Sequence, residues 1–440
     1  MTVNAILISI SLLLLLSFFR LNIIAALIFS AFIIPLFSAL SFEETWILFQ
    51  QGLTNSVTLA FSYALIGGFA YLLLKSGFID YVLHYFIQDL DQKPNNKMKS
   101  ILLSIIIIAS ILSQNILPIH VAIIPILIPP LLYYLNTINI DRRAISCSLS
   151  FGLVTSYMLL PFGFGELFFY DIVVKQVQAN GVMINTPINM FKIMFLPALG
   201  MLLGLTIAIF YTYKNKRQYT INQSQKKLYT PQLSFIEKSK LMMVFIVFIS
   251  IQLITKSIAL AALVGVLILC IGNKKEWQEN NDVFLFGTQN MAAVGVIMMV
   301  ASGYAEVIKH SGELGQLIET ALEISAHYSV YFSLFAMLII GLFLTIGIGS
   351  SFATVPIIAL FFVPICLHLQ LNVDVILCLI ASSAILGDTG SPASEVTLVT
   401  SSILNTNNEH QHIKDTVIPT FIHFNVPLLI FALLSCAILM

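Results

Sequence analysis

The densest group of residues able to do chemistry in this sequence lies between positions 387 and 397. Two carboxylates, Asp388 and Glu395, are seven residues apart, and two helical turns would place them on one face. Oxygen ligands that include a carboxylate suit a hard cation such as Na⁺, and a carboxylate in an apolar environment can also take up a proton. We therefore predict an ion site here; the alternative is that the carboxylates are structural, Asp388 capping a restarted helix. Hydroxyl oxygens are supplied by Thr389, Ser391, Ser394 and Thr397, and the expected Na⁺ ligands are Asp388, Thr389 and Ser394.

Other polar residues interrupt apolar sequence and are candidates for the same site. Glu166 follows a Pro- and Gly-containing break at 161–165, where it would be a second ion site or a pairing partner. His120 ends a polar tip and has a side chain suited to proton transfer near neutrality, although a hydrogen-bonded core histidine is the alternative. Asn115 lies in the same tip, and Ser350 and Ser351 lie in a second one; ordinary turn chemistry would also explain them.

Composition indicates what must surround these residues. Of the 440 residues, 58% are apolar and only 10% are charged, and the mean hydropathy is +0.95. Soluble domains carry about 25% charged residues. The chain is therefore predicted to be an integral membrane protein with a lipid bilayer as its environment. Its net charge of zero gives no footprint for nucleic acid, and its five cysteines are scattered singly, without metal-ligand spacing.

Apolar runs near the roughly 20 residues needed to cross a bilayer recur along the chain. Two pairs of shorter runs flank polar tips, which predicts two re-entrant hairpins with tips at 113–120 and 347–351. Two further runs break at 161–165 and 387–392, which predicts discontinuous helices. Amphipathic segments at 80–90 and 313–323 are expected to lie in the interface. The remaining expected spans are 5–18, 21–40, 53–74, 191–213, 241–254, 258–271, 284–308 and 416–440.

The same order of elements occurs twice. A shift of 235 residues brings seven identical residues into register between Phe49 and Gly77, and the shift continues from Asn115 to Ser350. We expect a first transmembrane repeat over 1–213, a cytoplasmic linker over 214–240 and a second repeat over 241–440. Five crossings in each half would invert the second repeat. The expected fold is an all-α polytopic membrane protein with about ten transmembrane helices, two re-entrant hairpins and two inverted-topology repeats with discontinuous helices.

The distribution of basic residues predicts the orientation. With both termini outside, seventeen Lys and Arg residues fall in inside loops and four fall outside. Inverted repeats with broken helices are typical of secondary transporters. No GxxxxGK[ST] loop for ATP occurs in the sequence, so coupling to an ion gradient is favoured.

Three segments carry a resemblance to a known family. They are Ser-Gln-Asn-Ile-Leu-Pro-Ile-His at 113–120, Gly-Ile-Gly-Ser-Ser-Phe-Ala-Thr-Val-Pro at 347–356 and Gly-Asp-Thr-Gly-Ser-Pro-Ala-Ser-Glu at 387–395. The chain resembles bacterial Na⁺/H⁺ antiporter family proteins of the NhaC-like type, within the ion transporter superfamily. The resemblance implies two hairpins, two unwound helices and frequently a homodimer, with the 388–395 segment and the hairpin tips near the transport site. Glu395 stands where Asp is expected, and the superfamily also moves organic anions and amino acids, histidine included.

The leading hypothesis is a Na⁺/H⁺ antiporter that works by alternating access in the bacterial inner membrane, with one carboxylate serving both ions. The alternative is a Na⁺- or H⁺-coupled amino-acid permease on the same scaffold. We expect that the protein is not an enzyme and that it uses no cofactor beyond the transported Na⁺ and H⁺. An intramembrane aspartyl protease using Asp171 and Asp388 is disfavoured, because Ile385 replaces the first Gly of its GxGD motif and the repeat would go unexplained. An uncoupled channel is disfavoured because a pore seldom needs inverted, broken-helix halves.

Overall fold

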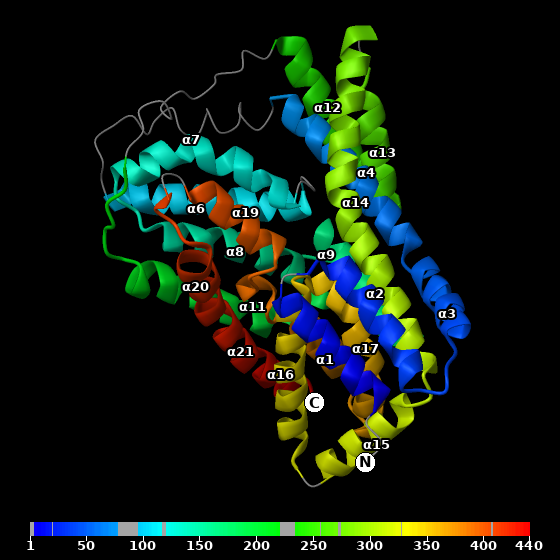
Figure 1. Cartoon of the computed structure of the whole chain (residues 1–440). Helices are drawn as coiled ribbons and strands as arrows, with labels where there is room; N and C mark the ends of the chain where they lie inside the picture. The colour runs from blue at the N-terminus through cyan, green and yellow to red at the C-terminus, as the bar shows by residue number, and fades with distance from the viewer. Residues whose placement is uncertain are drawn as a thin grey trace.

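The computed structural model describes residues 4–19, 21–77, 96–116, 120–220, 234–255, 257–271, 274–326, 328–405 and 408–440. Within these ranges the chain is helical and contains no strand (Figure 1). Among the residues that the structure describes, eight helices are long and apolar enough to cross a membrane, or nine if the bent pair Arg142–Leu159 and Phe164–Ala179 is one span. The protein is therefore an integral membrane protein, as its composition predicts, and the expected number of about ten crossings stays a prediction.

The helices follow the apolar runs of the sequence and begin at capping side chains. Ser41, Asp141 and Asn372 each accept a backbone N–H of the helix that follows. In chain order the helices are α1 (Ala5–Phe18), α2 (Ile23–Ile33), α3 (Phe42–Thr54), α4 (Val57–Lys75), α6 (Asn96–Asn115), α7 (Ile124–Thr137), α8 (Arg142–Leu159), α9 (Phe164–Glu166), α10 (Lys175–Ala179), α11 (Met190–Ile207), α12 (Phe235–Thr255), α13 (Ile258–Leu269), α14 (Lys274–His310), α15 (Leu314–Ala326), α16 (Val330–Ile348), α17 (Ser351–His368), α18 (Val373–Ile385), α19 (Glu395–Leu404), α20 (Ile418–Thr420) and α21 (Val426–Leu439). Tighter turns lie at Ile34–Leu36, His120–Ile123 and Asp388–Gly390, and wider π turns at Leu167–Val174, Ala208–Thr212, His412–Val417 and Phe421–Asn425.

The long helix α14 packs along both α3 and α4 and forms one side of the molecule (Figure 1). Glycines bring the backbones into direct contact: a Cβ added to Gly67 would lie 2.4 Å from the carbonyl oxygen of Gly287. A Cβ added to Gly52 would likewise lie 2.5 Å from the carbonyl oxygen of Ser302. Such close approach of small residues is how helices associate in a bilayer.

The core that surrounds the candidate site is built from α8, α17, α18 and the segments that follow the two broken helices. α18 is almost entirely buried, and its neighbours include α16, α17 and α21. α16 and α17 form the second hairpin: α16 ends at Gly349, whose backbone is left-handed, and Ser350 caps α17. In Figure 1 both chain termini lie towards the same end of the molecule as α15, and the start of α12 lies at the opposite end.

Local structure recurs between the two halves of the chain. Asn139 and Gln370, which end the two hairpins 231 residues apart, both have positive φ, at 58° and 53°. After each of them, the next amide donates to the carbonyl five residues earlier, Ile140 to Leu135 and Leu371 to Cys366. This offset differs from the expected shift of 235, so the repeat and its inverted orientation across the membrane stay predictions.

Several element bounds differ from the expectation. The expected third span over 53–74 is divided, because the chain turns at Asn55–Ser56 and a separate helix, α3, precedes the turn. α12 begins at Phe235, so the end of the expected linker is helical. The amphipathic helix expected at 313–323 is found as α15. The one expected at 80–90 lies outside the described residues, as do the middle of the first hairpin tip and most of the linker.

Candidate functional site

The candidate site is formed where α18 ends and the chain runs without regular helix to α19. Gly387, with a φ of 94°, turns the backbone, and its N–H donates to the side chain of Asn425 over 2.9 Å. The short turn Asp388–Gly390 follows, and Ser394 precedes the first residue of α19. The break expected at 387–392 is therefore present, and it leaves Asp388 inside the protein with only 6% of its surface exposed.

Three hydroxyl groups hold the carboxylate of Asp388. Ser351 donates to Oδ2 over 2.6 Å and Tyr157 donates to the same oxygen over 3.2 Å. Ser394 donates to Oδ1 over 2.7 Å. The hydroxyls of Tyr157 and Ser351 are also 2.7 Å apart. The site thus joins α8 of the first half, the second hairpin and the start of α19.

Aromatic rings close the site on one side. The ring of Phe352 lies 5.2 Å from the rings of both Tyr157 and Phe168, and 5.8 Å from the ring of Tyr63. The Tyr63 hydroxyl is buried and has no hydrogen-bond partner among the described residues. Glu395, the first residue of α19, is exposed and interacts electrostatically with both Asp388 and Tyr63. The two carboxylates therefore interact without sharing one helix face as their spacing predicts, because Asp388 lies in the short turn Asp388–Gly390 and α19 begins only at Glu395.

The other hydroxyl residues of the segment make contacts elsewhere. Thr389 donates to Asn425 over 3.3 Å, and Ser391 donates to the carbonyl of Ile346 over 2.8 Å. Ser350 caps α17 by accepting the N–H of Ala353 over 3.4 Å. These contacts fix the unwound segment against α16 and against the last span, so their direct role as ligands stays a prediction.

The polar residues of the first half gather around the other break. Asn115 donates to the carbonyl of Phe162 over 2.8 Å, which ties the end of α6 to the break after α8. Its own Oδ1 is buried with no partner in the part of the chain that the structure describes. Gly163, with a φ of 65°, turns this break and packs directly on the backbone of Asn115.

His120 and Glu166 are not part of the Asp388 hydrogen-bond group. The His120 ring lies 5.1 Å from the ring of Phe164, and its Nδ1 is within 3.1 Å of both side-chain polar atoms of Gln114. Glu166 lines a separate cavity of about 330 Å³ beside Gly163. The structure thus brings together Asp388, Ser394 and Ser351, and places Asn115, His120 and Glu166 at the first break.

Sequence reasoning missed Tyr157, Tyr63 and Asn425. Tyr157 lies two residues before the end of α8, and a tyrosine at a span end is ordinarily an interfacial anchor. Asn425 could have been identified from the sequence, because it lies inside the apolar last span and an uncharged polar side chain at such a depth needs a hydrogen-bond partner. Among the described residues no group of three or more His, Cys, Asp or Glu side chains could hold a metal ion.

Three curated relatives align with nearly the whole chain. A membrane protein of Vibrio parahaemolyticus is 37% identical over 99% of this chain and 100% of its own length. A membrane protein of Haemophilus influenzae is 38% identical over 97% of this chain and 98% of its own. YuiF of Bacillus subtilis, named as a proposed amino acid transporter, is 35% identical over 99% of this chain and 100% of its own.

Two solved transporters share the fold at low sequence identity. The YdaH transporter of Alcanivorax borkumensis matches with a TM-score of 0.58 at 13% identity, over 91% of this chain and 89% of its own. MtrF of Neisseria gonorrhoeae, described with a class of antimetabolite efflux pumps, matches with a TM-score of 0.60 at 14% identity, over 87% of this chain and 82% of its own. At these identities the likeness establishes the fold alone.

Family models identify the chain itself. The model described as "Na+-H+ antiporter family" matches residues 4–90. The model described as "Na+/H+ antiporter family" matches residues 148–433, a range that includes Tyr157, Ser351 and Asp388. The expected family is thereby confirmed, whereas the NhaC-like subtype stays a prediction. The chain belongs to the Na⁺/H⁺ antiporter family, a family of membrane transporters.

Proposed function

We propose that this protein exchanges Na⁺ for H⁺ by alternating access, and that Asp388 is the carboxylate the two ions use in turn. The observation that carries the proposal is the hydrogen-bonding of one buried carboxylate by three hydroxyls from three separate elements. Ser351, Ser394 and Tyr157 all reach it within 3.2 Å. An ionisable residue inside a membrane-spanning region is expensive to keep unless it serves transport.

Hydroxyl partners suit a site with two occupants. A hydroxyl can donate to the ionised carboxylate, as here, or rotate so that its oxygen lone pairs face a cation. Na⁺ bound to Asp388 would therefore be met by oxygen from Ser351 and Ser394, and a proton on the carboxylate would satisfy the same charge. Since either ion neutralises the one negative charge, binding of one displaces the other, and this competition couples the two fluxes.

Movement between halves of the chain would expose the site to each side in turn. Tyr157 belongs to α8, whereas Ser351 and Ser394 belong to the second hairpin and to the start of α19. A displacement of α8 relative to these elements would break the Tyr157 contacts and open the carboxylate to water. Thr389, Ser391 and Glu395 complete the proposed site around it.

The experiment is exchange in proteoliposomes with an imposed pH gradient, followed by a trapped pH dye as Na⁺, Li⁺ or K⁺ is added. Wild-type protein should release protons when Na⁺ is added, and Asp388→Asn should abolish the signal while remaining folded. Asp374→Asn is the matched control, because Asp374 lies in an exposed ion pair with Lys192 over 2.8 Å and should exchange normally. Full exchange by Asp388→Asn would remove this residue from the site.

A second candidate, a cation-coupled amino-acid permease, is favoured by the match to YuiF over 99% of the chain. It predicts that labelled amino acids accumulate in the same proteoliposomes when an ion gradient is imposed. Accumulation without cation-for-proton exchange would replace the first proposal with this one.

A further inference from the structure

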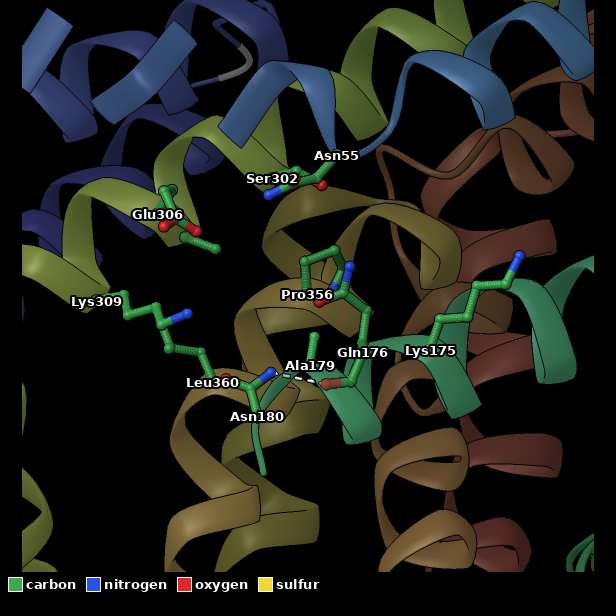
Figure 2. Close-up of a pocket in the computed structure, with 11 residues that line it drawn as sticks. Asn55, Lys175, Gln176, Ala179, Asn180, Ser302, Glu306, Lys309, Pro356 and Leu360 are labelled. Carbon is green, nitrogen blue, oxygen red and sulfur yellow. Dashed lines mark hydrogen bonds between the residues drawn. The ribbon is translucent and has the colours of Figure 1, made fainter. Parts of the chain in front are cut away.

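A second cavity, of about 250 Å³, lies apart from the Asp388 hydrogen-bond group (Figure 2). It is bounded by the turn between α3 and α4, by α10, by the last turns of α14 and by α17. Its apolar floor is made by Pro356 and Leu360 of α17. We call it the vestibule, because Pro356 lies five residues after Ser351, or about 7.5 Å along the helix axis from a direct partner of Asp388.

One wall of the vestibule carries two opposite charges. Glu306 and Lys309 are three residues apart on α14, and Figure 2 shows both on the same side, with the Lys309 ammonium extending towards the middle. Lys309 has no ion pair or hydrogen bond within the described ranges. Glu306 has only a 3.4 Å contact with the ring of His310, and 21% of its side chain is exposed. Both charges are thus available to a ligand.

The opposite wall offers amide groups. Gln176 and Asn180 come from α10, and Asn180 Nδ2 donates to the backbone carbonyl of Gln176 over 2.8 Å, which leaves its Oδ1 as an acceptor. Asn55 adds a third amide from the turn between α3 and α4. Lys175 also borders the cavity, but its ammonium bonds to Asp171 over 2.7 Å and points away in Figure 2.

The vestibule also leads towards the first break. Asn55, Lys175 and Gln176 line both it and the neighbouring cavity of about 330 Å³, which extends to Gly163 and Glu166. The two cavities are therefore adjacent and share a wall. A solute in the vestibule would lie between α17, which leads to Asp388, and the cavity that reaches Glu166.

From this arrangement we infer that the vestibule binds a small zwitterion, a molecule with one carboxylate and one ammonium group, of α-amino-acid size. Lys309 would bind the carboxylate and Glu306 the ammonium group. The amides of Gln176 and Asn180 would face the side of the ligand opposite these two charges. A purely anionic ligand would be repelled by Glu306, and a purely cationic one by Lys309. A cavity of about 250 Å³ is small enough to exclude large substrates. The inference deepens the second candidate function and rests on it only for the consequence that a bound ligand is transported.

The test is equilibrium binding to the purified full chain in detergent, without any gradient, using labelled L-alanine and L-histidine. Unlabelled propionate and propylamine, which carry one charge each, serve as competitors. Lys309→Gln and Glu306→Gln should each weaken binding at least tenfold. Lys192→Gln is the matched control, because Lys192 does not line the vestibule and lies in an exposed ion pair with Asp374, and it should bind within twofold of wild type. Both single-charge competitors should compete at least tenfold more weakly than alanine.

Each contrary outcome has a defined meaning. Absence of saturable binding to wild-type protein would overturn the inference, as would equal affinity in Lys309→Gln and wild type. Competition by propionate as strong as by alanine would overturn the zwitterion class. Asp388→Asn should keep full binding while losing exchange, so failure of the exchange assay with binding intact would count against the proposed antiport alone. Size-exclusion profiles matching wild type would show that the variants are folded.

Discussion

The hydroxyl of Ser351 donates to Asp388 Oδ2 over 2.6 Å, although 37 residues separate the two in sequence. Ser351 is the first residue of α17, at the turn of the second hairpin, and Asp388 is the first residue of the short turn that follows α18. A hairpin tip and a helix break therefore meet at one carboxylate. A change at the hairpin tip therefore acts on that carboxylate through a direct hydrogen bond, and α8 is the third element in contact with it, through Tyr157.

Tyr157→Phe should weaken cation binding while leaving the protein folded. The change keeps the ring that packs 5.2 Å from Phe352 and removes the hydroxyl that contacts Asp388 and Ser351. Loss of one hydrogen bond to a charged group corresponds to about 2 kcal/mol, or a rise of roughly tenfold or more in the half-saturating Na⁺ concentration. Tyr304→Phe, which removes a buried hydroxyl bonded to Ser9, should leave that concentration unchanged. An unaltered value in Tyr157→Phe would show that the tyrosine does not contribute.

Gly163→Ala should disrupt the first break. Its φ of 65° disfavours any Cβ, and an added Cβ would lie 2.5 Å from the carbonyl oxygen of Asn115. Gly312 has a similar φ of 79° but nothing within 4 Å of an added Cβ, so Gly312→Ala should cost only about 1 kcal/mol of strain. Thermal unfolding in detergent should therefore show a far larger loss for Gly163→Ala. Equal losses would mean that the close packing at Asn115 is unimportant.

Arg142→Gln should reduce stability and slow exchange. Its fully buried guanidinium donates to the carbonyl of Leu404, the last residue of α19, over 2.8 Å and stacks 4.2 Å from the ring centre of Tyr219. A cation at the C-terminal end of α19 interacts favourably with the helix dipole and holds the helix that begins beside Asp388. Removing a buried charged partner costs about 3 kcal/mol, whereas Lys192→Gln in an exposed pair should cost under about 1 kcal/mol. A melting curve for Arg142→Gln that matches Lys192→Gln would contradict this.

His410 should make the protein less stable in mild acid. Burial lowers the pKa of His410 to about 4, from an ordinary value of 6.5, and its Nε2 lies 2.7 Å from the hydroxyl of Thr416. Because the unfolded chain takes up the proton first, the stability present above pH 6.5 is lost as the pH falls towards 4. At pH 5 the loss is about 2 kcal/mol relative to pH 7. Melting temperatures at both pH values should show a smaller loss for His410→Asn, whereas His368→Asn, at an exposed site, should behave as wild type.

The expected orientation is tested by labelling single cysteines with an impermeant reagent in whole cells. Both Glu43 and Ser239 are exposed, at the start of α3 and near the start of α12. With both termini outside, Glu43→Cys should be labelled and Ser239→Cys should be labelled only after lysis. The half-buried Cys270 is replaced by Ser to remove background, since the other four cysteines are buried. The reverse labelling pattern would overturn the topology.

The parts of the site that are close in sequence were predictable, and those that depend on distant packing were not. Asp388 and Ser394 lie six residues apart across one break, so local spacing places them together. Tyr157 reaches Asp388 across 231 positions, and nothing in an apolar span distinguishes a tyrosine that faces inward from one that faces lipid. Glu166, like Asp388, follows a helix break in the sequence. The first break packs against Asn115, whereas the second packs against Ser351 at the start of α17, and Glu166 borders a cavity.

The apolar runs of the sequence predicted most of the helices, and the polar interruptions in those runs predicted the two helix breaks. The break at Asn55–Ser56 was missed because Val57 continues the apolar run and neither residue is a strong helix terminator in a membrane. The vestibule was missed for a similar reason: Glu306 and Lys309 are typical of a solvated span end, and only the packing of α10 and α17 encloses them.

The contacts of α14 with α3 and α4 decide which part of the molecule can be the stationary part. Backbone touches backbone at Gly52 and again at Gly67, fifteen residues apart, so no side chain lies between the helices at these two points to accommodate a slide of one against the other. We therefore expect α3, α4 and α14 to behave as one rigid unit, whether that unit moves or stays fixed during transport. During transport the remaining helices would move against the surface of this rigid unit. Lipids or inhibitors that bind between the unit and those helices would block transport without contacting the ion site.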